Sequence, residues 1–449
     1  MASISWRAFR ESRFVTGILI CMWLMVVITY FVPMFLLLPI ALLPGGTYAY
    51  RHITGWFDKY SRYACLCIPI VWCNARIHLH HAELLTEFKN GGNGVLLSTH
   101  CSRIDWLLAV VVGMYGRGNR VGFVAEVTTG FMPIVGWSRV LFGDILLQRT
   151  FHRDRPRIIQ NIEGFHRDGI QRIIFLAPEG AIADPGCEAD EKYVAQCGEF
   201  MKSLGKEPLT HLLTPRYKGM SAFVNHSPDN VAACTMTFVK GPGITFDKET
   251  GATSGGRRCS LALDDPKRMI PDLHTIFAGN LSAFISMHKL DIPVCDEADP
   301  KSALRIRDEL VNSQQLKDKE MQYFAANGKF PTVKSGADWE ELPAPRVMMN
   351  VILFTQLGLT CLVCSAVLGI SPAKFAMTSL WLFVRILLVY GASHAVGELL
   401  LGGRSSESLV GETAIKAALV YLTGRSANQG GKPEEATASK QAADPKKKD

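Results

Sequence analysis

A histidine and an aspartate five residues apart are the first residues in this sequence able to do chemistry. His100 and Asp105 stand in the segment STHCSRIDW, at residues 98–106. A histidine acts as a general base when a carboxylate binds its far ring nitrogen, because that contact fixes the tautomer and stabilises the imidazolium. On a straight helix, five residues separate two side chains by about 140°. The pair can therefore meet only if His100 lies on a turn that precedes the helix. Taken alone, the same residues also fit a turn histidine beside a helix-start aspartate.

Three further segments have residue types suited to a phosphate-bearing substrate. They are LFGDILLQR (141–149), FLAPEG (175–180) and TPRYKG (214–219). Arg149 ends the first, and a guanidinium suits bidentate contact with phosphate. Glu179 could accept hydrogen bonds from hydroxyl groups, and Gly180 permits close approach of a ligand to the backbone. Arg216 and Lys218 stand between a proline and a glycine. Each segment taken singly fits an ordinary solvated turn.

The order and spacing of all four segments resemble the glycerolipid acyltransferase family, the lysophosphatidic acid acyltransferase superfamily with its HX4D motif. The resemblance covers about residues 70–335 and is strongest to the eukaryotic branch that contains lysophosphatidic acid and lysocardiolipin acyltransferases. Members of that branch have a similar His-x4-Asp-Trp start and a similar Pro-Arg-x-x-Gly segment. They also have a C-terminal extension, which KD at 317–318 and GKFP at 328–331 resemble here.

The resemblance implies both an activity and a set of site residues. The implied catalytic residues are His100, as general base, and Asp105, which orients it. The implied substrate-binding residues are Arg149, Glu179, Gly180, Arg216 and Lys218. The implied reaction is direct transfer of an acyl group from acyl-CoA to a lysophospholipid hydroxyl. Lysophosphatidic acid is the acceptor that the resemblance favours. Acyl-CoA is a co-substrate, and its thioester is already activated for acyl transfer. Neither a metal nor a bound cofactor is therefore expected.

Two positions depart from the family pattern. Thr99 precedes the histidine where asparagine is usual, and Ala181-Ile182 follows Gly180 where Thr-Arg is usual. A phosphate-binding arginine is therefore missing from that turn. Either Arg149, Arg216 or Lys218 replaces it, or the phosphate of the acceptor binds differently. A remodelling enzyme for lysocardiolipin or another head group, and a non-catalytic lipid-binding protein on the same fold, remain as alternatives.

The elements that must position these residues follow an alternating pattern. Short β-prone runs at 94–98, 172–176 and 232–239 alternate with helical stretches at 106–114 and 155–167. This alternation predicts an α/β fold with a mixed sheet covered by helices. A strand at 94–98 that leads into a helix near 104 would also supply the turn that His100 requires. Residues 240–260 are rich in Gly, Thr and Lys and predict a surface loop, and folded character resumes with a strand at 281–287 and a helix at 301–324.

Long apolar segments at both ends exclude a purely soluble protein. Hydrophobic residues make up 48% of the 449, and charged residues make up 20%. Residues 14–43 and 347–370 contain no charge, and a membrane span needs about 20 apolar residues. A further segment, 375–396, carries an arginine at position 385. So few spans around a large polar middle disfavour a transporter.

The resulting prediction divides the chain into parts with different roles. The predicted parts are a retained N-terminal membrane anchor (1–60), an acyltransferase domain (61–342, with a loop or insertion at 241–260), C-terminal membrane segments (343–424) and a disordered tail (425–449). The Ser98–Trp106 motif and all the other candidate site residues fall in the second part.

Charge, cysteine and histidine usage indicate the partners and the compartment. A net charge of +7 without dense basic blocks disfavours nucleic acid and suits a lipid bilayer and phosphate-bearing substrates. Twelve scattered cysteines indicate reduced thiols and a catalytic domain that faces the cytosol. Lys446 and Lys447 resemble the di-lysine retrieval signal of endoplasmic reticulum membrane proteins, with a mitochondrial membrane as the less favoured location. His78, His80 and His81 do not predict a metal site, because alternation on a strand puts His81 on the opposite face.

Overall fold

The computed structural model describes most of the chain up to residue 378. The described residues are 11–85, 94–115, 120–131, 135–184, 187–226, 230–292, 294–295, 299–374 and 377–378. All features below lie in one compact unit, Met1–Met377. The second unit, Thr378–Asp449, lies outside the described residues apart from its first residue. The predicted disordered tail, the di-lysine signal and most of the predicted segment 375–396 therefore also lie outside them.

One mixed sheet organises the described part of the chain. Its strands are β1 (Arg76–His80), β2 (Gly94–Ser98), β3 (Arg120–Glu126), β4 (Ile145–Leu147), β5 (Arg172–Leu176), β6 (Asn230–Lys240), β9 (Arg257–Arg258), β10 (Leu281–Lys289) and β11 (Glu340–Glu341). The order across the sheet is β11-β1-β10-β6-β2-β5-β3-β4, and β9 pairs with the end of β6. Strands β2, β3, β4, β5 and β6 pair in parallel, whereas β10 is antiparallel to β6. The predicted mixed sheet is confirmed.

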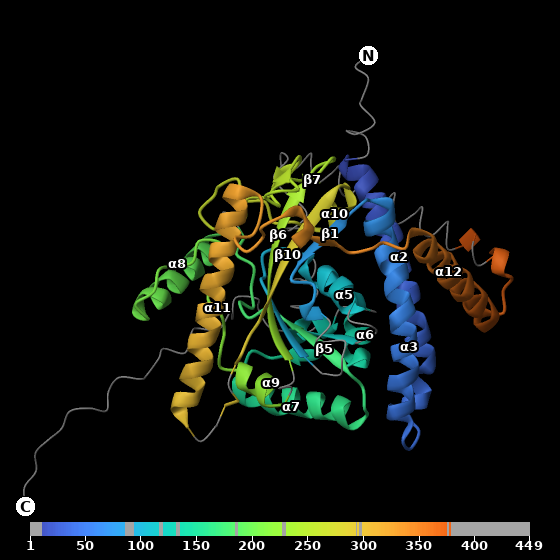
Figure 1. The fold of residues 1–449 in the computed structure, drawn as a ribbon. Helices are drawn as coiled ribbons and strands as arrows, with labels where there is room; N and C mark the ends of the chain where they lie inside the picture. Colours follow the sequence, from blue (N-terminus) through green and yellow to red (C-terminus); the bar gives the residue numbers. More distant parts are fainter. Residues whose placement is uncertain are drawn as a thin grey trace, which may run out of the picture. The chain divides into compact units, whose positions relative to one another are not determined.

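Helices cover both faces of this sheet, as Figure 1 shows. The helices are α2 (Arg13–Ala41), α3 (Gly46–Leu66), α5 (Asp105–Tyr115), α6 (Val135–Phe142), α7 (Phe151–Arg167), α8 (Glu188–Ser203), α9 (Met220–His226), α10 (Leu273–Phe277), α11 (Pro300–Asn327) and α12 (Arg346–Leu368). One apolar core joins α2, α3, α5 and α10 to one face. A second core joins α7, α9 and α11 to the other face. The α/β class is confirmed.

Local sequence explains where several elements begin and end. All five residues of β2 are buried, as a central parallel strand requires. On α7, Ile158, Ile162 and Phe165 are buried at helical spacing. Helix α11 begins after Asp299, whose carboxylate accepts the N–H of Lys301. It ends at Gly328, which has a φ of 71°.

Some boundaries differ from those that the sequence pattern predicts. Helix α7 begins at Phe151 rather than at 155. The apolar run 65–72, which predicts an interfacial segment or the entry to a strand, finishes α3 and continues as the π-helical turn η1 (Cys67–Trp72). Residues 240–260 form a small hairpin of β7 (Thr245–Phe246) and β8 (Thr253–Ser254), followed by β9. Short 3₁₀ turns, η2 (Val127–Phe131) and η3 (Gly336–Asp338), complete the described elements.

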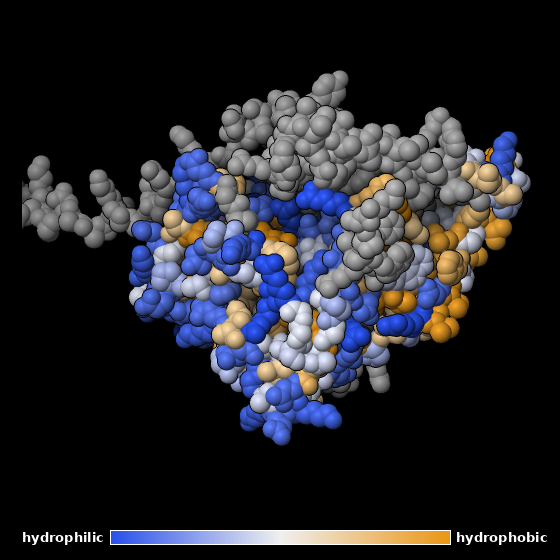
Figure 2. All heavy atoms as spheres, turned by 90° about the horizontal axis from the view of Figure 1, so that it is seen from above, coloured by the Kyte–Doolittle hydropathy of each residue, from blue (hydrophilic) through white to orange (hydrophobic). Residues whose placement is uncertain are grey.

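Two helices are long and apolar enough to cross a membrane by length and composition. They are residues 13–41, in α2, and 346–366, in α12. About 40% of the most apolar stretch of α2 is buried inside the protein, against 17% for α12. Seen from above, hydrophobic residues gather on the side of α12, and hydrophilic residues cover the opposite side (Figure 2). The predicted domain boundary between 60 and 61 falls inside α3.

The parallel strands bring the candidate segments to one edge of the sheet. His100 follows the end of β2, Arg149 follows β4 and Glu179 follows β5. Because parallel strands have their carboxyl ends at the same edge, residues far apart in the chain meet there.

Candidate active site

The histidine and the aspartate of the HX4D segment are in direct contact. Strand β2 ends at Ser98 and α5 begins at Asp105, so His100 lies on the turn between them. Nδ1 of His100 lies 2.5 Å from Oδ2 of Asp105. The other oxygen of Asp105 accepts the N–H of Trp106 at 2.7 Å. A carboxylate acceptor at Nδ1 places the proton on that nitrogen and leaves Nε2 free to accept one.

Backbone contacts hold this turn in place. The Thr99 N–H donates to the carbonyl of Cys234, and the N–H of Met236 donates to the Thr99 hydroxyl at 3.1 Å. The N–H of Arg103 donates to the carbonyl of Pro271. Thr99, the residue that replaces the usual asparagine, is therefore buried and fastens the turn to β6.

Glu179 lies beneath the turn rather than on the surface of the site. Its side chain is buried, at 1% exposure. Oε2 accepts the backbone N–H of His100 at 2.5 Å, and Oε1 accepts the side-chain amide of Gln314. Both carboxylate oxygens are thus occupied by protein donors. The position of Glu179 fits a residue that holds the histidine turn.

A buried lysine acts electrostatically on this carboxylate. Lys317 of α11 donates to the carbonyl of Leu97, the penultimate residue of β2, at 2.9 Å. Burial raises the pKa of Glu179 to about 7, although the charges of Lys317 and His100 and the hydrogen bond from Gln314 act in the opposite direction. Burial also lowers the pKa of Lys317. The Glu179–Lys317 pair therefore titrates in a dry environment directly below the histidine.

The environment of His100 favours its protonated form. Burial lowers the pKa of His100, but the hydrogen bond and charge of Asp105, with the charge of Glu179, outweigh that effect. The pKa of His100 is therefore above its usual value. Its side chain remains 27% exposed, so a substrate can reach it.

Two of the predicted substrate-binding arginines meet at the turn that follows Glu179. Arg149 donates to the carbonyl of Gly180 at 3.3 Å and forms an ion pair with Glu126 at 2.9 Å. The N–H of Arg216 donates to the carbonyl of Pro178. Gly180 has a φ of 67°, and a Cβ at this position would lie 3.2 Å from Nε of Arg216. The predicted Lys218 is exposed two residues beyond Arg216.

Sequence reasoning missed two further arginines that border residues 181–184. Arg103, within the HX4D segment, pairs with the carboxylate of Asp184 at 2.9 Å. Arg268, from the loop before α10, donates to the carbonyl of Ala183 at 2.7 Å. Among the described residues, the buried Nε of Arg268 has no hydrogen-bond partner. Four arginines from four segments therefore surround the turn where the usual Thr-Arg is absent: Arg103, Arg149, Arg216 and Arg268.

Gln314 and Lys317 were also missed as parts of the site. The available signal was a polar face on α11, because Gln314, Lys317 and Asp318 recur at helical spacing and are all buried. Asp318 accepts the N–H groups of residues 210–212 at 2.7–3.2 Å. That face of α11 therefore contacts both the loop of Glu179 and the loop at residues 210–212, and it holds them in place.

The clustered histidines have structural surroundings. His78 is buried between Phe246 and Phe284, and burial lowers its pKa to about 4. His80 contacts the hydroxyl of Thr332 at 2.9 Å. Within the described residues, no group of three or more His, Cys, Asp or Glu side chains could hold a metal ion.

Comparison with known proteins matches the segment that carries the predicted site. Residues 76–225 match a family model described as acyltransferase. A "probable 1-acyl-sn-glycerol-3-phosphate acyltransferase 5" of Arabidopsis thaliana is 24% identical over 273 residues, covering 59% of this chain and 62% of the relative. The "1-acyl-sn-glycerol-3-phosphate acyltransferase delta" of Rattus norvegicus is 24% identical over 196 residues, covering 40% of this chain and 50% of the relative.

A third relative differs in its named acceptor. "Lysocardiolipin acyltransferase 1" of Danio rerio is 23% identical over 197 residues, covering 42% of this chain and 46% of the relative. The matches thus span from about half to 62% of the length of these relatives. No solved structure matches the chain. Every residue predicted for the site lies between 76 and 225, whereas α11, with Gln314 and Lys317, lies beyond that segment.

Proposed function

Because residues 76–225 form an acyltransferase domain of the glycerolipid acyltransferase superfamily, we propose that this protein transfers an acyl group from acyl-CoA to the free hydroxyl of a lysophospholipid. Lysophosphatidic acid is the proposed acceptor and phosphatidic acid the product. The observation that carries the proposal is the contact of 2.5 Å between Asp105 and the partly exposed side chain of His100.

In the proposed reaction, His100 acts as general base and then as general acid. Its Nε2 takes the proton of the acceptor hydroxyl while the hydroxyl oxygen attacks the thioester carbonyl of acyl-CoA. When the tetrahedral intermediate collapses, the carbon–sulfur bond breaks and the CoA thiolate receives the proton from His100. Asp105 stabilises the imidazolium between these steps. The proposed transfer exchanges a carbon–sulfur bond for a carbon–oxygen bond and moves one proton, so it needs no oxidant and no metal.

Transfer without an acyl-enzyme agrees with the state of the neighbouring thiol. Cys101 adjoins His100, but it is buried, and burial raises the pKa of its thiol. A thiol that stays protonated is a poor nucleophile. Direct attack by the acceptor hydroxyl is therefore the step that we propose.

The arginines around residues 181–184 support an acceptor that carries phosphate. Arg149 and Arg216 border Gly180, and Arg103 and Arg268 border the following residues. Guanidinium groups bind phosphate oxygens through two parallel N–H donors. We therefore assign to this set the role of the arginine that is missing from the turn.

Two alternatives to this function are each supported by a specific observation. The Danio rerio relative is named for lysocardiolipin, which supports a remodelling enzyme with a larger acceptor. Ala181-Ile182 in place of Thr-Arg supports a lipid-binding protein without catalysis. The His100–Asp105 contact favours the enzyme over the binding protein.

The location that we propose is a membrane, with the endoplasmic reticulum as the first candidate and the catalytic domain facing the cytosol. The two apolar helices and the hydrophobic side over α12 support membrane attachment. Such attachment would place the site beside its lipid substrate.

One experiment tests the class and the acceptor together. Membranes containing the protein are incubated with acyl-CoA and a panel of lysophospholipids, and the release of CoA thiol is followed. The panel holds lysophosphatidic acid and lysolipids with choline, inositol, glycerol and cardiolipin head groups. We expect thiol release with lysophosphatidic acid, and its loss in the variant His100→Ala.

The matched control is Cys101→Ala, which we expect to retain thiol release because the neighbouring thiol is not a nucleophile. Folding of each variant is checked by its thermal unfolding in detergent. Unchanged thiol release in folded His100→Ala protein would refute the mechanism. Release with lysocardiolipin instead of lysophosphatidic acid would select the remodelling enzyme, and no release with any acceptor would select the binding protein.

A further inference from the structure

A cavity separate from the histidine site lies where the sheet meets the apolar helices. Its volume is about 330 Å³, and its walls come from α3, η1, the start of β1, α5 and the segment that leads into α12. Ligand pockets occupy about 300–1,000 Å³, so this cavity has room for one small group or one chain. No residue predicted for the active site lines it.

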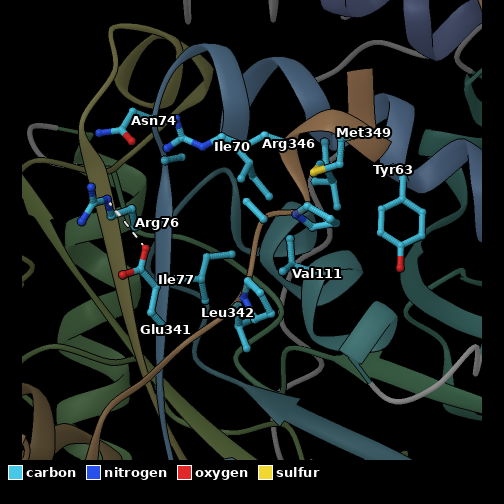
Figure 3. Close-up of a pocket in the computed structure, with 15 residues that line it drawn as sticks. Tyr63, Ile70, Asn74, Arg76, Ile77, Val111, Glu341, Leu342, Arg346 and Met349 are labelled. Atoms are coloured by element: carbon cyan, nitrogen blue, oxygen red, sulfur yellow. Dashed lines mark ion pairs between the residues drawn. The ribbon is translucent and has the colours of Figure 1, made fainter. Parts of the chain in front are cut away.

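The interior of the cavity is apolar. Figure 3 shows Tyr63, Val111 and Met349 on one side, with Ile77 and Leu342 towards the middle. A smaller hollow adjoins it, shares several of its lining residues and continues along Leu107 and Leu108 of α5. Apolar residues of the helix that begins with Asp105 therefore border the cavity and the hollow beside it.

The opposite side of the cavity is polar and basic. Asn74, Arg76 and Glu341 lie on that side (Figure 3). Arg346, the first residue of α12, adds a second guanidinium. Arg76 and Glu341 are 3.7 Å apart and about half exposed, so their pairing is weak. Two arginines against one glutamate leave a net positive charge where an anionic group could bind.

The surface beside this cavity is hydrophobic. On α12, Val347, Val351 and Phe354 are 79%, 58% and 59% exposed. On α3, Trp56 and Tyr60 are also exposed. Helix α3 packs against α12. An arginine at the start of an apolar helix, with exposed aromatic side chains on its neighbour, is typical of the boundary between lipid head groups and acyl chains. A molecule that reaches this cavity from that boundary has an apolar chain and a polar head.

From these observations we propose that the cavity is a binding site for one anionic phospholipid of the surrounding bilayer. One acyl chain lies among Tyr63, Val111 and Met349, and the phosphate is bound by Arg76 and Arg346. This proposal rests on the membrane attachment proposed above, but it does not depend on acyl transfer. It assigns to the start of α12 a role in lipid recognition.

The test measures lipid retention in the absence of acyl-CoA. The full chain, purified in detergent, is mixed with dioleoyl phosphatidylglycerol or dioleoyl phosphatidylcholine, and the bound lipid is counted by native mass spectrometry. The two lipids share their chains and differ in net charge, and neither is the proposed substrate or product. Phosphatidylcholine has the same phosphate, but its choline cation neutralises that charge, so only phosphatidylglycerol presents a net negative charge to the two arginines. We therefore expect a preference of about tenfold or more for phosphatidylglycerol.

Two variants separate the chain from the head group. Ala344→Trp places a large side chain at the cavity wall, and we expect it to lose both lipids. The double variant Arg76→Gln/Arg346→Gln keeps the cavity, and we expect it to retain lipid without the preference for phosphatidylglycerol. The matched control is Arg305→Gln, at an exposed arginine of α11, which should behave as the unaltered protein.

The outcomes distinguish this site from the active site. His100→Ala should still retain phosphatidylglycerol, even though it loses acyl transfer. Equal retention of both lipids by the unaltered protein would overturn the role of the arginines. Full retention of phosphatidylglycerol by correctly folded Ala344→Trp would overturn the cavity as the site. A protein without acyl transfer that still prefers phosphatidylglycerol would refute the proposed enzyme and leave this site standing.

Discussion

At the scale of single residues, the candidate site contains two layers of ionisable side chains. His100 and Asp105 form the upper layer, and Glu179 and Lys317 form a buried layer below it. The N–H of His100 joins the two layers, because it donates to the carboxylate of Glu179. A change in the charge of Glu179 therefore changes the pKa of His100.

Removing the charge of Asp105 should change both the rate and its pH dependence. The base must be neutral to accept a proton, so acyl transfer should rise with pH through the pKa of His100, which lies above the usual value of 6.5. In Asp105→Asn the groups that raise this pKa are weakened while burial still lowers it, so the inflection should move to lower pH. We expect kcat to fall by about 10²–10⁴-fold. The measurement is kcat/KM against pH, with Asp308→Asn on the exposed side of α11 as the matched control. An inflection that stays at the same pH would contradict the assigned role of Asp105.

Removing the charge of Lys317 should destabilise the fold in a pH-dependent way. In Lys317→Met, Glu179 loses the cation that lowers its pKa, so its pKa should rise above about 7. A raised carboxyl pKa in the folded state makes stability fall as pH rises towards that pKa. At about pH 8 we expect a loss of about 3–5 kcal/mol, because a buried charge is left without its partner.

At about pH 6 the loss should be smaller, because Glu179 then binds a proton and needs no cation. The measurement is chemical unfolding of the detergent-solubilised protein at both pH values. Lys319→Met, a substitution on the same helix, is the control. A loss of equal size at both pH values would mean that Lys317 acts by packing alone.

At the scale of elements, the carboxyl ends of parallel strands build the site. Much of this could be predicted, because apolar runs marked β2, β5 and β6, and the five-residue spacing predicted the turn at His100. The support from α11 could not be predicted in the same way. Gln314 is 135 residues from Glu179 in the chain, and a local pattern contains no information about which distant helix packs below a turn.

The left-handed turn at Gly180 offers a test at this scale. In Gly180→Ala, the methyl group would crowd Arg216 and the φ of 67° would become strained. We expect KM for the lysophospholipid to rise several-fold while KM for acyl-CoA changes less, since the displaced arginine belongs to the proposed phosphate site. The measurement is the pair of KM values.

The matched control is Gly205→Ala, at the end of α8. Gly205 has a φ of 68°, but a Cβ there would meet nothing within 4 Å. Both variants therefore pay a similar strain of about 1–2 kcal/mol, and only one of them moves Arg216. Equal changes of KM in both variants would show that backbone strain alone is responsible.

At the scale of the whole described unit, α2 is joined directly to the segment that carries the proposed catalytic pair. The ring centroid of Trp23 lies 5.9 Å from that of Trp106 and 5.8 Å from that of Phe277. The indole N–H of Trp23 donates to the carbonyl of Cys65 at 2.8 Å. Trp106 is the residue that follows Asp105. The charge-free run at 14–43 predicted an apolar helix, but its contact with α5 depends on packing between distant residues and has no signature in the sequence.

The contact between Trp23 and Trp106 has a consequence for the kinetics. If α2 lies in a bilayer, the proposed base His100 is held at a fixed depth, and the proposed acceptor would reach it by diffusion in two dimensions. The rate should then follow the mole fraction of lysophosphatidic acid in the surface. When inert phosphatidylcholine is added at constant total lysophosphatidic acid, the initial rate should fall in proportion to the dilution. A rate set by the bulk concentration alone would mean that the acceptor is taken from water, and that the attachment of α2 to the catalytic turn serves stability only.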